Sequence, residues 1–78
     1  MNTSIGKIEK AAFAGDETAQ CKMGDWYFFS ENEDDTIKYS KAAYWYRIAA
    51  NQGNPVGQYN LAYQYEHALG VDADAVQA

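Results

Sequence analysis

The chain has 78 residues, enough for one small domain, and 47% of them are hydrophobic, which argues against a disordered protein. Its formal net charge is −5 and its six basic residues are scattered, so nucleic acid and anionic membrane surfaces are disfavoured as partners. A mean hydropathy of −0.56, without a long apolar run, argues against a membrane span. The single cysteine, Cys21, excludes an intrachain disulfide and a cysteine-based metal cluster.

Two helices are predicted in the first third of the chain. Apolar residues with helical spacing occur over residues 5–13, and Gly15 can end this helix in a left-handed conformation. Asp16 is a good N-cap for the next helix, predicted over residues 17–29. Gly24 lies in the middle of that helix, where glycine costs about 1 kcal/mol relative to alanine. We therefore expect a neighbouring helix to approach closely at Gly24.

The segment 30–36 (SENEDDT) is predicted to be a loop because it contains four carboxylates and no apolar side chain. A third helix is predicted over residues 38–51. A fourth is predicted over residues 55–67, with Asn54 as its N-cap and Pro55 at its first position, where the missing N–H group costs nothing. The remaining tail predicts a loop and the first turn of a further helix.

The chain resembles itself at an offset of 38 positions, the distance from Gly15 to Gly53. The same offset aligns Ala11-Ala12 with Ala49-Ala50, Gln20 with Gln58, Met23 with Leu61, Gly24 with Ala62, and Tyr27 with Tyr65. Self-similarity at a period of roughly 20–50 residues indicates a repeat architecture. Because Ala62 aligns with Gly24, we expect it to be a second position of close helix approach.

The residues in these positions resemble the Sel1-like repeat family, a relative of the tetratricopeptide repeat. The matching residues are Lys41-Ala42, Trp45-Tyr46, Ala49-Ala50, Gly53, Leu61-Ala62, Tyr65 and Leu69-Gly70-Val71. The resemblance implies an all-α fold, an α/α solenoid of antiparallel helix pairs with about four helices plus a C-terminal stub. It implies a single domain over 1–78, with a leading B-type helix at 1–14, repeat 1 at 15–52 and an incomplete repeat 2 at 53–78. It also implies protein–protein scaffolding and no chemistry.

The resemblance also indicates where a partner would bind. In tetratricopeptide-like folds the first helix of each pair, the A helix, lines the concave surface that receives a peptide or helix. One side of the two predicted A helices has the mixture of aromatic and polar groups that a partner anchor needs. The candidate partner-binding residues are Lys22, Asp25, Phe29, Asn60, Tyr63 and His67. Alternatively, Phe28, Phe29 and Tyr63 extend the core towards a neighbouring repeat.

The sequence predicts no catalytic, cofactor or metal site. His67 has no evident nucleophile or orienting carboxylate beside it, and Cys21 is expected to be a small residue at a helix–helix contact. The acidic run of Glu31, Glu33, Asp34 and Asp35 lacks the residue order of a calcium loop, so we expect solvated charge there.

Two functions remain after these exclusions. The first is a module or scaffold that binds a partner peptide or helix through the A-helix groove. The alternative is a self-associating unit, a homodimer formed through exposed helix ends, which the unfinished second repeat favours. An enzyme is the least supported class. Residues 1–8 lack the apolar segment of a signal peptide, so we expect a cytoplasmic location.

Overall fold

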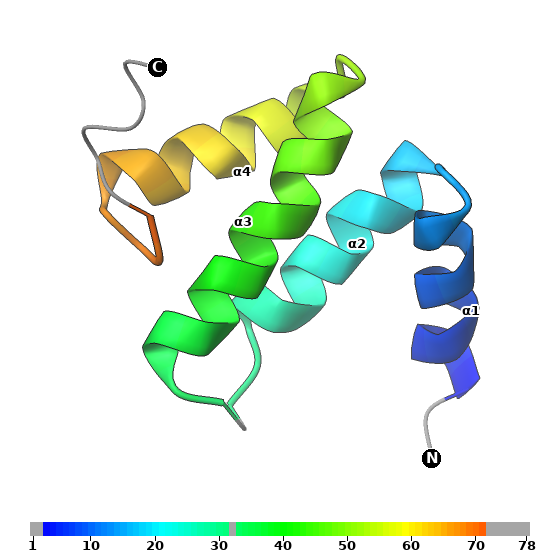
Figure 1. The fold of residues 1–78 in the computed structure, drawn as a ribbon, viewed down its shortest axis with the longest axis horizontal. Helices are drawn as coiled ribbons and strands as arrows, with labels where there is room; N and C mark the ends of the chain where they lie inside the picture. Colours follow the sequence, from blue (N-terminus) through cyan, green and yellow to red (C-terminus); the bar gives the residue numbers. More distant parts are fainter. Residues whose placement is uncertain (1–2, 32, 72–78) are drawn as a thin grey trace.

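A computed structural model describes residues 3–31 and 33–71 (Figure 1). Four helices follow one another, α1 (Thr3–Phe13), α2 (Glu17–Phe28), α3 (Asp35–Asn51) and α4 (Pro55–Glu66). No strand occurs within these described ranges, so the prediction of an all-α fold is confirmed. The predicted C-terminal stub lies in residues 72–78, outside the described part of the chain.

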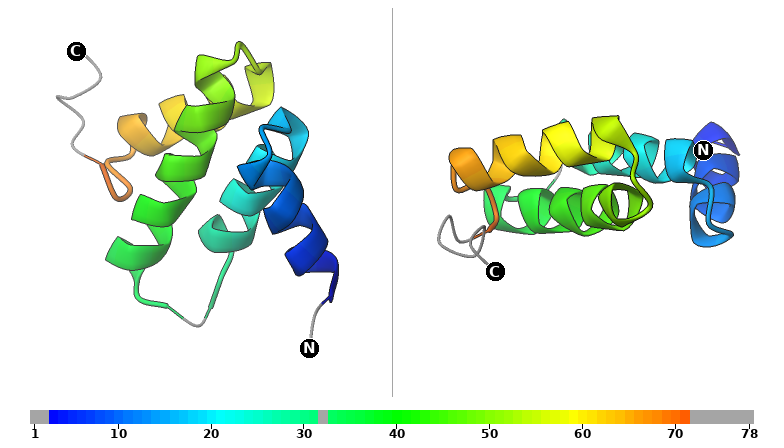
Figure 2. Two further views of the ribbon diagram at one scale, coloured as in Figure 1. Left: turned by 45° about the vertical axis from the view of Figure 1, so that its right-hand side comes forward. Right: turned by 90° about the horizontal axis from the view of Figure 1, so that it is seen from above.

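The helices pack in the order of the sequence, α1 against α2, α2 against α3, and α3 against α4. α2 and α3 run antiparallel, and α2 and α4 lie on the same side of α3 (Figure 2). This arrangement is that of consecutive helix pairs in a solenoid, in which each element contacts its neighbours in the sequence. Of the helices in the described ranges, none has the length and apolar character needed to cross a bilayer.

The predicted caps of α2 and α4 are confirmed. The side chain of Asp16 accepts a hydrogen bond from the amide of Ala19 at 2.8 Å, and the side chain of Asn54 accepts one from the amide of Gly57 at 3.0 Å. The residue before each cap is a glycine with a positive φ, +108° at Gly15 and +90° at Gly53. These left-handed residues end the preceding helices and turn the chain into the next one.

The beginning of α3 differs from the prediction. The helix begins at Asp35, three residues before the predicted Lys38. The reason is Asp34, whose side chain accepts a hydrogen bond from the amide of Ile37 at 3.0 Å and so acts as the N-cap. The acidic run therefore contains both the loop and the first turn of a helix.

The core lies between α1, α2 and α3. Its fully buried centre consists of Ala12, Ala19, Met23 and Trp45. Phe13 covers this centre from α1, with its ring edge-on to Trp45 and the ring centroids 5.0 Å apart. An aromatic pair of this geometry adds about 0.5–1.5 kcal/mol to the contribution of the area that it buries.

Gly24 is a position of close helix approach, as predicted. A Cβ atom at this residue would lie 2.4 Å from Cε1 of Tyr46, so the ring of Tyr46 occupies the space that a side chain would need. The expectation for Ala62 is wrong, because Ala62 is exposed. The close approach of α4 to α3 occurs instead at Gly57, where a Cβ would lie 2.9 Å from the backbone nitrogen of Ala50.

Candidate functional site

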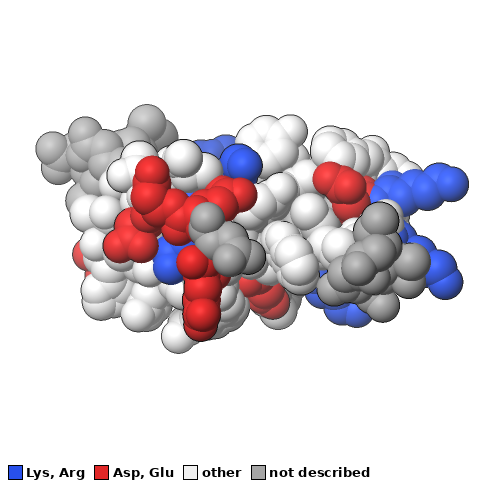
Figure 3. Space-filling model, turned by 90° about the horizontal axis from the view of Figure 1, so that it is seen from below, with Lys and Arg blue, Asp and Glu red and all other residues white. Residues whose placement is uncertain are grey.

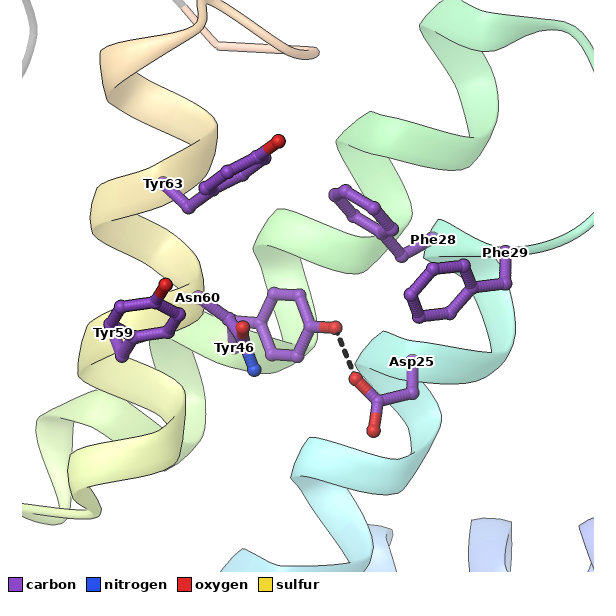
Figure 4. Close-up of a pocket in the computed structure, with 7 residues that line it drawn as sticks. All are labelled: Asp25, Phe28, Phe29, Tyr46, Tyr59, Asn60 and Tyr63. Atoms are coloured by element: carbon purple, nitrogen blue, oxygen red, sulfur yellow. Dashed lines mark hydrogen bonds between the residues drawn. The ribbon is translucent and has the colours of Figure 1, made fainter.

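A hollow of about 280 Å³ lies between α2 and α4, with Tyr46 of α3 between the two helices (Figure 4). We call it the α2–α4 groove and define it by the residues that line it, which are Asp25, Phe28, Phe29, Tyr46, Tyr59, Asn60 and Tyr63. Pockets for drug-sized ligands usually measure roughly 300–1,000 Å³. The groove is slightly smaller than that range.

Aromatic rings form most of the groove. Phe28 is the half-buried centre of a cluster, with ring centroids 5.0 Å from Phe29, 5.2 Å from Tyr39 and 6.3 Å from Tyr63. The outer rings are open to solvent, since Phe29 is 72% exposed, Tyr59 is 71% exposed and Tyr63 is 42% exposed. Exposed rings gathered around a hollow are typical of a surface that binds another molecule.

One carboxylate faces this aromatic surface. The hydroxyl of Tyr46 donates a hydrogen bond to Oδ1 of Asp25 at 2.5 Å (Figure 4). Burial raises the pKa of Tyr46 well above its usual range, and the hydrogen bond to Asp25 and its charge raise it further. The hydroxyl therefore keeps its proton and holds one oxygen of Asp25 in place. Because Gly24 of α2 has no side chain, the ring of Tyr46 on α3 can approach α2 closely enough to reach Asp25.

Four of the six predicted partner-binding residues line the groove, namely Asp25, Phe29, Asn60 and Tyr63. His67 lies beside it as the C-cap of α4, and its ring is tilted by 45° against that of Tyr63 at a centroid distance of 4.3 Å. Lys22 does not belong to the groove. It lines a separate hollow formed by α1 and α2.

The sequence prediction missed three lining residues. Tyr46 is almost fully buried, and nothing in the sequence distinguishes such an aromatic residue from any other core residue. The sequence predicts Phe28 only as an extension of the core. Tyr59 aligns with Cys21 in the first repeat, so the repeat comparison contained no aromatic signal at this position. The spacing of four residues between Tyr59 and Tyr63 is the signal that was available, because residues i and i+4 share a helix face.

Cys21 is buried at the contact between α2 and the beginning of α4, as the sequence predicted. Its thiol donates a hydrogen bond to Oδ1 of Asn54 at 3.4 Å. Burial raises the pKa of the Cys21 thiol, and the charges of Asp25 and Glu17 add to this effect. A raised pKa opposes formation of the thiolate, which is the reactive form of cysteine.

Cys21 and His67 do not form a catalytic pair. Cys21 contacts the N-cap of α4, whereas His67 is the C-cap of the same helix. The 12 residues of α4 span about 18 Å at 1.5 Å per residue, far beyond the reach of a hydrogen bond.

The acidic side chains gather at the end of the molecule where α2 and α3 are joined (Figure 3). Two of them form ion pairs with lysines of α3, Glu33 with Lys41 at 3.5 Å and Asp35 with Lys38 at 3.6 Å. Among the residues that the structure describes, no three His, Cys, Asp or Glu side chains are grouped so as to hold a metal ion. The cluster is therefore best described as solvated and partly paired charge.

Helices that pack consecutively in the order of the sequence are characteristic of an α-helical repeat protein. The chain belongs to the Sel1 repeat family, whose family model matches residues 18–54 and 55–78. Sel1 repeats are generally protein–protein interaction modules and are typically not enzymes. No solved structure matches the chain.

Three curated relatives are similar to the chain in sequence. The chain is 39% identical over 66 residues to human protein sel-1 homolog 2 and 38% identical over 66 residues to a Sel1-like repeat-containing protein of Schizosaccharomyces pombe. It is 33% identical over 69 residues to the chitin synthase regulator SKT5 of Saccharomyces cerevisiae. These alignments cover 83%, 83% and 88% of the chain but only 9%, 10% and 10% of the relatives. The chain thus spans about a tenth of the length of these relatives.

Proposed function

We propose that this chain is a protein-binding module that holds a segment of a partner protein in the α2–α4 groove. The observation that supports this most strongly is the set of exposed rings, Phe29, Tyr59 and Tyr63, around a hollow whose buried side is closed by Tyr46. Aromatic side chains at the centre of an interface contribute most of the binding energy in many complexes. The proposal is also supported by the family match, because α2 and α4 are the first helices of the two matched repeats and the resemblance implies that such helices line the binding surface.

We propose further that the module is not catalytic and that it works in the cytoplasm. The groove is lined by one carboxylate and no nucleophile, and Cys21 and His67 lie at opposite ends of α4. Cys21 is a free thiol, which suits a reducing compartment. The proposal concerns this segment of 78 residues and not the functions of its longer relatives.

The test begins with peptides selected from a random phage-displayed library on the immobilised chain. Affinities of the selected peptides are then measured by fluorescence polarisation against Phe29→Ala and Tyr63→Ala. We expect each substitution to weaken binding about tenfold, because each removes an exposed ring that lines the groove.

Two variants serve as matched controls. Tyr44→Ala removes an exposed ring of α3 outside the groove, and Lys22→Ala removes the predicted residue that the structure places elsewhere. Both should bind the selected peptides normally, and the melting curves of all four variants should show that they are folded. Equal losses in the controls and the groove variants would refute the groove as the binding surface.

A second candidate function is self-association. On α4, the last described helix, Val56 and Tyr59 are both more than half exposed, and a second copy of the chain would cover them. Sedimentation across a range of concentrations tests this candidate. A dimer that Val56→Glu converts to a monomer would support it, whereas a monomer at every concentration would exclude it.

A further inference from the structure

Resting on the proposed function of the groove, we propose that the partner segment is basic and that the α2–α4 groove anchors one of its arginine side chains. The guanidinium group lies against the carboxylate of Asp25, and the plane of the group and its apolar stem lie on the rings of Phe29 and Tyr63.

The first argument is the charge of Asp25. It is the one charged residue among those that line the groove, and Oδ1 already accepts the hydroxyl of Tyr46. Within the described ranges, no lysine or arginine lies within ion-pair distance of Asp25. A carboxylate beside apolar rings and without a counter-charge favours a cation, and a guanidinium group matches a carboxylate with two parallel N–H donors.

The second argument is a neighbouring hollow of about 230 Å³ that shares two residues with the groove. Asp25 and Phe29 line both hollows, and the second also contains Trp26 and Glu31. Glu31 likewise has no ion-pair partner in the part of the chain that the structure describes. Two unpaired carboxylates therefore accompany the exposed ring of Phe29, in a chain whose net charge is −5. This local field attracts cationic groups and repels acidic ones.

The third argument comes from the basic residues of the chain itself. Three of them lie over tyrosine rings, at 5.0 Å for Lys38 over Tyr39, 5.2 Å for Lys41 over Tyr27, and 5.5 Å for Arg47 over Tyr65. No described lysine or arginine lies over the rings of Phe29, Tyr59 or Tyr63, although the imidazole of His67 packs against one side of Tyr63. The most exposed groove rings, those of Phe29 and Tyr59, are therefore open to a cation supplied from outside. Arginine is preferred over lysine because its planar, weakly hydrated group stacks on aromatic faces.

The probe is the tripeptide acetyl-leucyl-arginyl-leucinamide, titrated into the isotopically labelled 78-residue chain and followed by two-dimensional amide NMR. Its matched control replaces arginine by citrulline, which has the same shape without the charge. A third tripeptide contains lysine. We expect the arginine peptide to shift amides of Asp25–Phe29 and Tyr59–Tyr63, and to bind about tenfold more tightly than the citrulline peptide. The lysine peptide should rank between them.

Protein variants test whether the charge of Asp25 causes the preference for arginine. Asp25→Asn keeps an oxygen that can accept the Tyr46 hydroxyl but removes the charge, so the arginine and citrulline peptides should bind it about equally. Glu9→Gln on α1 removes the same charge outside the groove and should leave the preference for arginine unchanged. Equal binding of arginine and citrulline peptides to the original chain would overturn the proposal. So would shifts confined to the acidic connection between α2 and α3, or no binding at millimolar peptide.

The outcome of the library selection distinguishes a failure of the arginine anchor from a failure of the proposed groove function. Selected peptides that depend on Phe29 and Tyr63 but contain no basic residue would leave the groove function standing and overturn the arginine anchor. Selected peptides whose binding ignores Phe29 and Tyr63 would overturn both. Basic peptides that lose their affinity in Phe29→Ala and in Asp25→Asn would support both.

Discussion

Helices α2 and α4 are aligned copies in the sequence, yet they bury different amounts of their surface. Met23 of α2 is 2% exposed, whereas Leu61 of α4, 38 positions later, is only half-buried. Cys21 is 6% exposed, whereas its aligned residue Tyr59 is 71% exposed. The same position in the repeat is thus core in one helix and surface in the other.

The difference follows from the number of neighbours. α2 lies between α1 and α3, whereas α4 packs mainly against α3 within the described part of the chain. Tyr59 is therefore left open, whereas its aligned residue Cys21 is covered where α2 meets Asn54 at the beginning of α4. In a repeat protein, burial is a property of the position in the stack as well as of the sequence motif.

At one aligned position the residue of α4 is more buried than the residue of α2. Gln64 of α4 is fully buried, whereas its aligned residue Trp26 of α2 is nearly half exposed. The amide nitrogen of Gln64 donates to the backbone oxygen of Tyr39 at 2.8 Å and to that of Leu69 at 3.0 Å. A buried amide therefore ties the end of α4 to the beginning of α3, and α4 relies on a polar contact there.

The largest effect should come from truncating Met23, and its aligned residue Leu61 provides the comparison. Met23→Ala should lower the free energy of unfolding by about 2–5 kcal/mol, because a fully buried side chain leaves a cavity. Leu61→Ala should cost about half as much or less, because its side chain is only half-buried and water can replace it. Urea unfolding followed by circular dichroism measures both. Equal losses would mean that α4 is as well packed as α2 and that its fewer neighbours do not matter.

The next effect concerns the glycine that brings α2 and α3 together. Gly24→Ala should destabilise the protein by about 1–3 kcal/mol, because the added Cβ would meet the ring of Tyr46 at 2.4 Å. The control is Gly6→Ala in α1, where no atom lies within 4 Å of the added Cβ. That variant should gain up to about 1 kcal/mol from the higher helix propensity of alanine. If thermal melting showed the same gain at Gly24, the close approach at Tyr46 would be refuted.

Much of the fold could be predicted because it rests on local chemistry. Asp16 and Asn54 are caps, and Gly15 and Gly53 take the positive φ that ends a helix. These features depend on a few adjacent residues, which a single sequence displays. The cap at Asp34 was not predicted, because Asp34 stands in a run of acidic residues and such a run is also typical of a loop.

The groove could be predicted only in part because it depends on how helices cross. Lys22 and Asp25 lie three residues apart on one side of α2, but the first faces a hollow shared with α1 and the second faces α4. Ala62 is small, yet the contact between α3 and α4 occurs at Gly57. A sequence shows which residues share a helix face, but the neighbour that each part of the face meets is decided by the packing angle.

The smallest effects are expected from removing the N-caps of α2 and α4. Asp16→Ala should cost about 1 kcal/mol, the usual effect of losing a cap. Asn54→Ala should cost about 2 kcal/mol, because Asn54 also makes two contacts with α2. Its amide donates to Glu17 at 2.8 Å, and its oxygen accepts from the thiol of Cys21 at 3.4 Å.

Asn54→Ser separates the two roles of Asn54, because serine can still cap α4 but is too short to reach Glu17. We expect Asn54→Ser to lose about 0.5–1.5 kcal/mol, the net value of a hydrogen bond. In a double-mutant cycle with Glu17→Ala, most of that loss should disappear once Glu17 is absent. If Asn54→Ser were as stable as the original chain, the hydrogen bonds from Asn54 to α2 would contribute nothing. α4 would then be held to the rest of the protein by its packing against α3 and by Gln64.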